Sequence, residues 1–366
     1  MNLFDVADLV HAGRVMLFWA LALAVLLAPL WPAWREWRHP TDDLPLPVVR
    51  HHSGDARNFA AHFMRWLDEH ASERLAWATS HGDNSGVIAM GRQTFRLLGA
   101  PDSWLAQQHG QRITEGLLAQ GALHLPAGTQ CQWEVASPIA VTVGEGCALR
   151  AVASGGPLTL GERSQVLRWA DAAEVAHVHA HAVLAGRLTA GQAVVLAPGV
   201  QFTRLSAPRI TVEGPAIATV VPTPAVDWAP DRGEAMDKIG RTWRYPAALR
   251  LEAGAVVRQH LVVDGDLHIG HGAQVHGDLK VHGRLSTDEG VHLHGSLVVT
   301  GDAHLGAHSR LKGPVVCEGI LQAGLGVRFG TPDHTTTLTA RRIQLAQGVS
   351  VYGSVWAREL GLTETA

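Results

Sequence analysis

Apolar and polar residues alternate along the last third of the chain, and glycine breaks the alternation about every six residues. Gly277, Gly295 and Gly313 mark a larger period of eighteen. Eleven of twelve positions spaced by six could lie in a core, the twelve being Leu251, Val257, Val263, Ile269, Val275, Val281, Thr287, Leu293, Val299, Leu305, Leu311 and Cys317. This pattern indicates very short strands with one buried face, separated by bends at which glycine relieves the backbone.

Three such strands in eighteen residues form one triangular coil. Stacked at about 4.8 Å, each strand pairs with the strands above and below it. A single coil cannot bury its apolar face, so only a stack is stable. The sequence therefore predicts an all-β chain with a β-solenoid over residues 249–359 and a tail over 360–366. A second inward set is expected at Leu261, Leu267, Ala273, Leu279, Leu285, Val291, Leu297 and Ala303.

A weaker repeat occupies residues 120–213 and predicts an irregular solenoid segment. Its inward markers, with one degenerate copy near Val178, are Leu125, Val143, Leu160 and Leu196, followed six residues later by Cys131, Leu149, Val166 and Phe202. Residues 214–248 contain five prolines together with Trp228 and Trp243. They are interpreted as an excursion or linker between the two segments.

The N-terminal region, residues 1–39, predicts a membrane anchor. Val15 to Trp34 is twenty residues without a charge, enough to cross a bilayer as one helix. A cleaved signal peptide is the alternative, but bulky Trp and Pro follow where small residues would be needed. Arg35 and Arg38 after the span favour a single-pass protein with a cytoplasmic C-terminal part.

Residues 40–119 are expected to form a linker and a helical region. Phe59, Phe63, Trp66 and Leu67 recur at helical spacing, which predicts one amphipathic helix over residues 55–77. The helix is expected to cap or pack against the solenoid. A helix on the membrane surface is the alternative, although its polar face is not notably basic.

Charge and cysteine content narrow the function classes. The formal net charge is −3 without a basic block, which argues against a nucleic-acid partner. Cys131, Cys147 and Cys317 lie in apolar runs and are interpreted as small buried hydrophobes. No phosphate loop, nucleophile elbow or metal-ligand cluster is found in the sequence, so no cofactor is expected.

Histidines are frequent in the second repeat, and most occupy outward or corner positions. His276 and His294 are equivalent in successive coils and are expected to stack about 4.8 Å apart. Solvent-facing polar residues are the preferred interpretation. A shared metal and a pH-responsive surface are the alternatives, although a structural zinc site wants four ligands.

The runs Val263-Asp-Gly-Asp-Leu-His-Ile-Gly, Gly277-Asp-Leu-Lys-Val-His-Gly and Gly295-Ser-Leu-Val-Val-Thr-Gly-Asp resemble the bactofilins, the polymer-forming cytoskeletal proteins of bacteria. The resemblance covers roughly the last 110 residues. It implies a right-handed triangular β-helix that assembles without nucleotide, often at the membrane, and acts as a scaffold for envelope or cell-shape proteins. The chain departs from the family in its long N-terminal region with a second repeat block.

A hexapeptide-repeat acyltransferase is the alternative, and Ile269-Gly-His-Gly-Ala-Gln is similar to one of its repeats. Its coils need a small residue at the fifth position of each hexad. Here bulky leucine occupies this position in two hexads of every three, at Leu261, Leu267, Leu279, Leu285 and Leu297. No long loop that could carry a catalytic base interrupts Leu251 to Phe329. The pattern therefore favours a scaffold over an enzyme.

The last coil is expected to be the assembly interface. A solenoid end exposes unpaired backbone groups that template pairing with another copy. The residues after the last coil are too few to cover it, so Val349, Val351 and Val355 are expected to line a contact between the C-terminal ends of two copies. Filaments would form only if the opposite end were also open. The expected partners are other copies of the chain, the lipid bilayer and envelope proteins.

Overall fold

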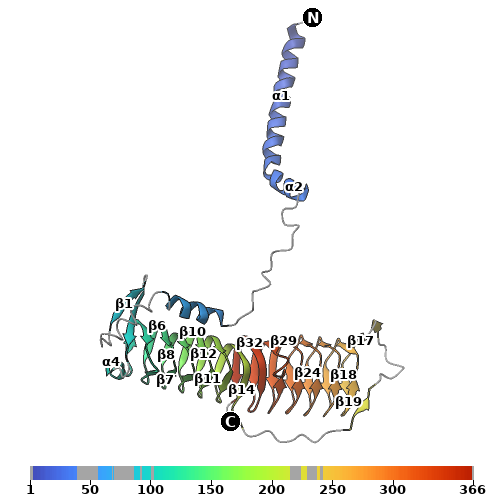
Figure 1. Ribbon diagram of the computed structural model, residues 1–366. Helices are drawn as coiled ribbons and strands as arrows, with labels where there is room; N and C mark the ends of the chain where they lie inside the picture. Colours follow the sequence, from blue (N-terminus) through green and yellow to red (C-terminus); the bar gives the residue numbers. More distant parts are fainter. Residues whose placement is uncertain are drawn as a thin grey trace. The chain divides into compact units, whose positions relative to one another are not determined.

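The computed structural model describes residues 3–38, 57–67, 69, 86–90, 93–99, 103–214, 224–228, 237–239 and 242–364. The chain divides into two compact units, residues 1–55 and 56–366. Within them lie an apolar helix and a β-solenoid, respectively (Figure 1).

The N-terminal unit contains α1 (Leu3–Leu27), a 3₁₀ turn η1 (Ala28–Leu30) and α2 (Trp31–Arg38). The segment Gly13–Leu30 is long and apolar enough to cross a membrane, and none of it is buried against protein. The expected span Val15 to Trp34 is not one continuous helix, because proline follows the end of α1 and cannot donate the helical hydrogen bond. Trp34 therefore lies in the separate helix α2.

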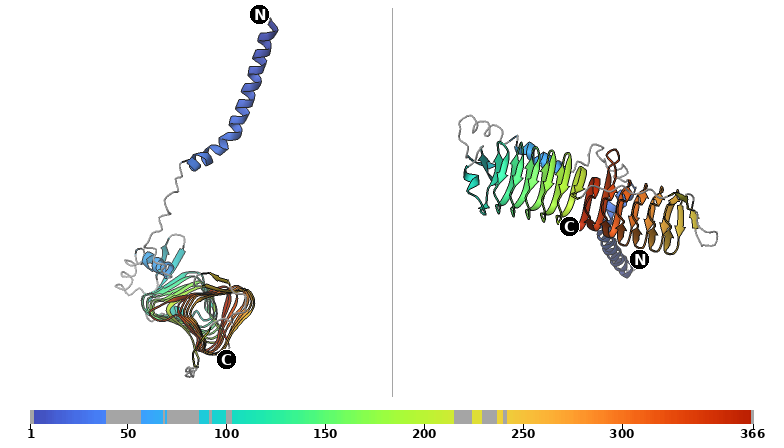
Figure 2. Two further views of the ribbon diagram at one scale, coloured as in Figure 1. Left: turned by 90° about the vertical axis from the view of Figure 1, so that its right-hand side faces the viewer. Right: turned by 90° about the horizontal axis from the view of Figure 1, so that it is seen from below.

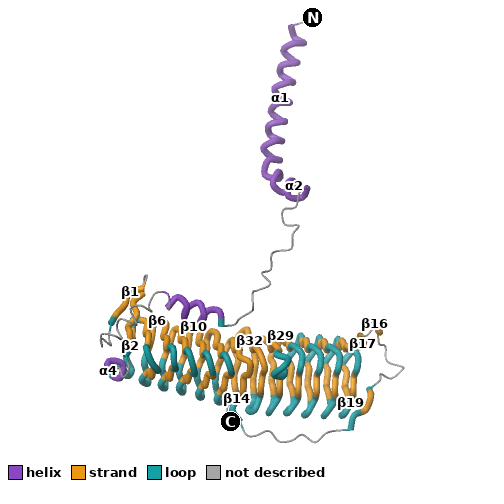
Figure 3. Tube along the Cα trace, in the orientation of Figure 1, coloured by secondary structure: helices purple, strands orange, loops and turns teal. Residues whose placement is uncertain are grey.

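The second unit is a stack of coils whose end-on view has three sides (Figure 2). Its first segment alternates long and short strands (Figure 3). The strands of its longer, bent side are β2 (Gln93–Leu98), β3 (Arg112–Ile113), β4 (Gly116–Ala119), β6 (Gln130–Ser137), β8 (Ala148–Ser154), β10 (Gln165–Ala172), β12 (Val183–Ala190) and β14 (Gln201–Val212). The short strands are β5 (Leu123–Leu125), β7 (Val141–Val143), β9 (Leu158–Leu160), β11 (Val175–Val178) and β13 (Ala193–Leu196).

The second segment has three columns of short strands that merge into longer strands at its last coils. The first column contains β18 (Leu249–Leu251), β21 (Leu267–Ile269), β24 (Leu285–Thr287) and β27 (Ala303–Leu305). The second contains β19 (Ala255–Val257), β22 (Gln274–Val275), β25 (His292–Leu293), β28 (Arg310–Leu311) and β30 (Arg328–Phe329). The third contains β17 (Thr242–Tyr245), β20 (His260–Val263), β23 (Leu279–Val281) and β26 (Leu297–Val299). The long strands are β29 (Val315–Ala323), β31 (Thr336–Leu345) and β32 (Ser350–Thr363).

The predicted register of the second segment is confirmed. Strands one coil apart pair in parallel with partners eighteen residues apart, as in Leu267 with Leu285. Every position of both predicted inward sets is buried, including Thr287, whose hydroxyl accepts a hydrogen bond from the Gly306 N–H at 2.9 Å. Outward positions such as His282 remain exposed. An apolar core, from Leu98 to Ala357, runs through both segments, and a second, smaller cluster includes Phe95 and Leu67.

Glycine is required where successive coils approach most closely. A Cβ added to Gly295 would collide with the backbone of Gly277, and one added to Gly313 would collide with that of Gly295. The glycine column therefore reflects coil spacing rather than conformational freedom, because any side chain would push neighbouring coils apart.

The first segment begins earlier than predicted. The expected boundary at residue 120 is wrong, since β2 pairs with β4 and β4 with β6, and the stack starts at Gln93. The degenerate copy is a complete coil in which Val178 pairs with Leu160 and Leu196. In this coil Ala176 stands where the neighbouring coils have Leu158 and Val194, which makes the repeat weaker in the sequence.

The spacing between successive coils changes near residue 331. Ala323 pairs with Leu345, twenty-two residues later rather than eighteen. The extra residues form a small turn in which Thr331 and His334 exchange backbone hydrogen bonds of 2.9 and 3.1 Å.

Residues 58–67 form a helix that lies along one side of the first segment, which confirms the expected packing for this part of residues 55–77. Residues 68 and 70–77 of that prediction lie outside the described part of the chain. The Phe63 ring meets Trp169 of β10 edge-on, with centroids 5.5 Å apart. Arg57, just before the helix, forms a bidentate pair with the buried Asp171 at 2.9 and 2.8 Å.

Candidate functional site: the joint and the outer ends

The two solenoid segments meet at their last coils, through β14 of the first and β32 of the second (Figure 1). All neighbouring coils within a segment pair in parallel, but β14 and β32 pair antiparallel. We call this contact the joint. The ladder includes Leu205 with Val355 and Ile210 with Val351. One chain therefore contains two stacks joined C-terminal coil to C-terminal coil.

The expectation of an open edge at the last coil is wrong. Val349, Val351 and Val355 are each at most 1% exposed. Val351 and Val355 lie in β32, which pairs with β14 of the same chain, and the Val349 carbonyl accepts a hydrogen bond from the Val212 N–H at 3.0 Å. The presumed tail from residue 360 is also part of β32, which extends to Thr363. The strand edge of the last coil pairs with the first repeat block of the same chain, because an unpaired strand edge pairs readily with an edge that the chain holds close to it.

Side chains reinforce the joint. The buried hydroxyl of Thr363 accepts a hydrogen bond from the Val200 N–H and donates one to the Ala197 carbonyl, both 2.8 Å long. The hydroxyls of Ser206 and Ser354 lie 3.0 Å apart. Each of these contacts links the two blocks, so the joint depends on matched polar groups as well as on apolar packing.

The outer end of the first segment is covered in part. Strand β1 (Val87–Met90) forms an antiparallel hairpin with β2 over one side of the first coil. The short helix α4 (Ser103–Ala106) places Leu105 in the core, with Trp104 packed beside it. Among the described strands, β3 and β5 pair only on the side facing the next coil.

The outer end of the second segment is covered by residues from the expected linker. Strand β15 (Val226–Asp227) pairs with β19, and the hairpin of β16 (Asp237–Ile239) and β17 lies against β20. Trp228 and Trp243 pack against the core, with ring centroids 5.6 Å apart. In the described part of this end, β18 pairs on one side only, with β21.

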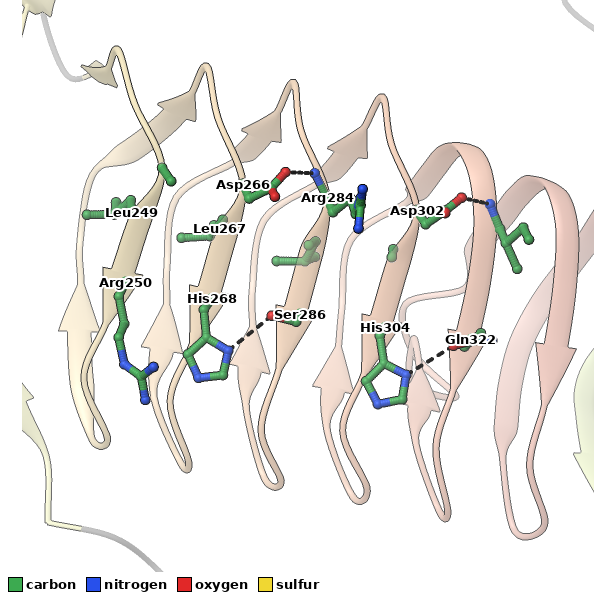
Figure 4. A pocket seen from close by; sticks show the side chains of 14 residues that line it. Leu249, Arg250, Asp266, Leu267, His268, Arg284, Ser286, Asp302, His304 and Gln322 are labelled. Atoms are coloured by element: carbon green, nitrogen blue, oxygen red, sulfur yellow. Dashed lines mark hydrogen bonds between the residues drawn. The ribbon is translucent and has the colours of Figure 1, made fainter.

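One side of the second segment carries a ladder of polar side chains in a shallow groove of about 590 Å³ (Figure 4). His268 Nδ1 lies 3.0 Å from Ser286 Oγ, and His304 Nδ1 lies 3.3 Å from Gln322 Oε1. The Asp266 carboxylate accepts a hydrogen bond from the Arg284 backbone N–H at 2.7 Å. These bonds join successive coils, so the groups stabilise the stack.

His268 contacts both Ser286 and Asp288, which is the order of groups in the Ser-His-Asp triads that catalyse acyl transfer. His268 Nε2 lies 3.5 Å from Asp288 Oδ2, on the far side of the ring from Ser286. A similar contact between successive coils joins the equivalent His304 to Gln322, which is not a nucleophile. Ser286 also lies within a strand whose backbone is committed to ladders on both sides, which leaves little to stabilise an oxyanion. The contact is best explained as one rung of the polar ladder.

His276 and His294 stack as predicted, with ring centroids 4.5 Å apart. Burial, followed by the nearby His276, Lys312 and His292, lowers the pKa of His294. Burial, followed by Arg310 and Lys312, lowers the pKa of His292. Across the described residues, no group of three or more His, Cys, Asp or Glu side chains is placed to hold a metal ion.

The three cysteines are free and buried, as the sequence predicts. Burial and the neighbouring Cys147 raise the pKa of Cys131 to about 12. The Cys147 and Cys317 thiols donate hydrogen bonds to carbonyl oxygens, at 3.0 and 3.2 Å respectively. The thiols therefore remain protonated and act as small core residues.

Comparison of the chain with protein-family models, with curated proteins and with solved structures finds no match in any of the three. The fold and the joint therefore carry the functional argument. Sequence reasoning missed the partner of the last coil. One signal was present in the first block, because its last strand, β14, has no glycine between Gln201 and Val212.

Proposed function

We propose that this protein is a membrane-anchored, non-enzymatic scaffold of bactofilin type that assembles without nucleotide and positions envelope or cell-shape proteins. The observation that carries the proposal is the joint. It unites two repeat blocks into one stack with a continuous core. Such a structure offers a long, regular surface, as scaffold proteins require.

The internal joint changes how copies could assemble. The C-terminal coils are occupied within the chain, so homo-oligomers form through the outer ends, where β3, β5 and β18 each pair with a described strand on one side only. These strands are two or three residues long. Short edges pair weakly, which favours small assemblies over long filaments.

The apolar segment Gly13–Leu30 supplies the membrane anchor in this proposal. In α2, the Trp31 and Trp34 rings lie 5.1 Å apart and Arg38 stacks over Trp34 at 4.6 Å. Tryptophan and arginine at the end of a span suit the headgroup region, and basic residues favour the cytoplasmic side. The proposed location is the bacterial inner membrane, with the solenoid in the cytoplasm.

Electron microscopy of the full-length protein in liposomes, without nucleotide, tests the scaffold proposal. We expect clusters whose size grows with protein density. Arg250→Pro should reduce clustering because proline removes a backbone donor from β18, which pairs with a described strand on one side only, whereas Arg250→Ala should not. Evenly dispersed single copies at every density would overturn self-assembly.

A further inference from the structure

One side of the second segment carries two rows of basic side chains. Strands β25, β28 and β30 of this side pair in parallel, so outward residues eighteen apart lie in line. The first row is His292, Arg310 and Arg328, and the second row, two residues later in each coil, is His276, His294 and Lys312. Residues two apart in a strand point to the same side, so both rows share one surface, which we call the basic face.

Three side chains of the basic face carry a permanent charge and are exposed, namely Arg310, Lys312 and Arg328. Within the part of the chain that the structure describes, none of these three side chains forms an ion pair or a hydrogen bond. Their guanidinium and ammonium donors are therefore available to a ligand.

The half-buried histidines of the basic face lie within the field of these charges. Burial, followed by Arg310 and Lys312, lowers the pKa of His292. Burial, followed by His276, Lys312 and His292, lowers the pKa of His294. The two rings therefore add little charge at neutral pH, and the positive charge of the basic face comes from its arginines and lysine.

Acidic residues flank the basic face at the corners of the coils. Asp278, Asp288 and Glu289 each lie beside a histidine that is not part of the face, at 3.1, 3.5 and 3.9 Å respectively. Asp333 is exposed in the turn after β30, where it sets one negative charge against three positive ones. The whole chain carries a net charge of −3, so the basic face is a local concentration of positive charge.

We propose that the basic face binds the phosphate groups of an anionic bilayer surface. The inference rests on the proposed membrane anchor, Gly13–Leu30, and adds a second contact with lipid. The two rows lie on one face of a parallel sheet, so their charges are presented to a plane rather than to a cavity. Lysine and arginine side chains are attracted to anionic lipid within about one Debye length of the membrane surface.

The tether to the anchor favours a bilayer over a soluble anion. Residues 39–56 are eighteen residues, which can extend to about 65 Å at most. A membrane that holds the anchor therefore remains within reach of the second unit. Binding through a tether gains from a high effective concentration, so three permanent charges suffice where a free ligand would need more.

Vesicle sedimentation tests this with the full-length protein held in nanodiscs of neutral lipid, where the anchor is already inserted. Vesicles containing phosphatidylglycerol should pellet the nanodiscs, and vesicles of phosphatidylcholine alone should not. Arg310→Gln/Lys312→Gln/Arg328→Gln should raise the lipid concentration at half-binding about tenfold or more. Raising the ionic strength from about 0.1 M to about 1 M should also weaken binding, because the Debye length falls from about 10 Å to about 3 Å.

Arg163→Gln/Arg250→Gln/Lys280→Gln is the matched control, because it removes the same charge from exposed positions outside the basic face. It should bind like the wild type. Arg310→Lys/Arg328→Lys keeps the charge and should change the half-binding concentration by about threefold or less, since a charged surface does not require the planar guanidinium. A loss as large as that of the triple Gln variant would overturn the proposal in favour of a ligand of fixed geometry.

Equal binding to neutral vesicles would overturn the proposal, as would an equal loss of binding in the matched control. Binding of inorganic polyphosphate without binding of phosphatidylglycerol vesicles would overturn it in favour of a soluble polyanion. The carbonate wash scores the anchor and microscopy scores assembly, so failure of the basic face leaves the proposed function standing.

Discussion

The backbone of Leu205 in β14 pairs antiparallel with that of Val355 in β32, although the two residues belong to different repeat blocks. Both side chains are 1% exposed. This pairing converts what would be two open C-terminal ends into one internal joint. It also explains how a chain with two repeat blocks forms a single core, since neither last coil is left to solvent.

The joint predicts a stability effect without a change in oligomeric state. Val351→Lys places a charge opposite Ile210 at a fully buried position and should lower the free energy of unfolding by several kcal/mol. Leu360→Lys, on the exposed side of the same strand, should cost about 0.5 kcal/mol or less. Thermal unfolding followed by circular dichroism measures both.

Light scattering provides the complementary readout for Val351→Lys. The joint lies within one chain, so the number of copies per particle should not change. A variant that kept the wild-type melting temperature but separated into smaller particles would show that the last coil contacts another copy.

The register predicts a contrast between neighbouring residues of β23. Val281 is fully buried, and Val281→Asp should destabilise the segment by several kcal/mol because it buries an unpaired charge. Lys280→Asp, one residue earlier and exposed, should change stability by about 0.5 kcal/mol or less. Similar melting temperatures for the two variants would mean that the strand does not present alternate residues to the core.

Inward positions could be predicted because period-two alternation reports burial directly. The inward positions from Leu251 to Cys317 could be assigned without knowing which coils are neighbours. The apolar or polar character of each position depends only on whether it faces the core or solvent. The joint could not be predicted in this way, because Val355 shows the same alternation whether its neighbour is Leu205 or another copy.

The glycine column predicts a steric effect. In Gly295→Ala the new Cβ would meet the backbone of Gly277, which cannot move without separating the coils. We expect a loss of about 1–3 kcal/mol, the range of overpacked sites. Gly86→Ala is the control, because only a side-chain carbon of Leu97 approaches its added Cβ, at 4.0 Å. Equal melting temperatures for the two variants would contradict the close approach of the coils.

The histidine pair predicts lower stability in acid. Because the pKa of His294 is lower in the folded chain than in the unfolded chain, the unfolded state takes up protons first as the pH falls. Stability should therefore decline as the pH drops below the ordinary histidine value of about 6.5. The groups that disfavour the charged ring besides burial are His276, Lys312 and His292.

The variant His292→Gln/His294→Gln should reduce this acid sensitivity. Melting temperatures measured between about pH 8 and about pH 5, where histidine titrates, would show a flatter profile for the variant. His124→Gln, on the first segment, is the control. A wild-type melting temperature that rose on acidification would contradict the lowered pKa values.

The anchor predicts how the protein fractionates. If Gly13–Leu30 spans the bilayer, the full-length protein should stay with membranes through a carbonate wash. Leu21→Arg/Leu23→Arg should release a large fraction, since an arginine near the centre of a span costs about 2.5–3.5 kcal/mol on insertion scales. Phe59→Arg, outside the span, is the matched control and should remain bound. Release of the wild-type protein by carbonate would rule out a span. The side of the membrane is tested by adding protease to intact spheroplasts, where digestion of the solenoid would place it outside the cytoplasm.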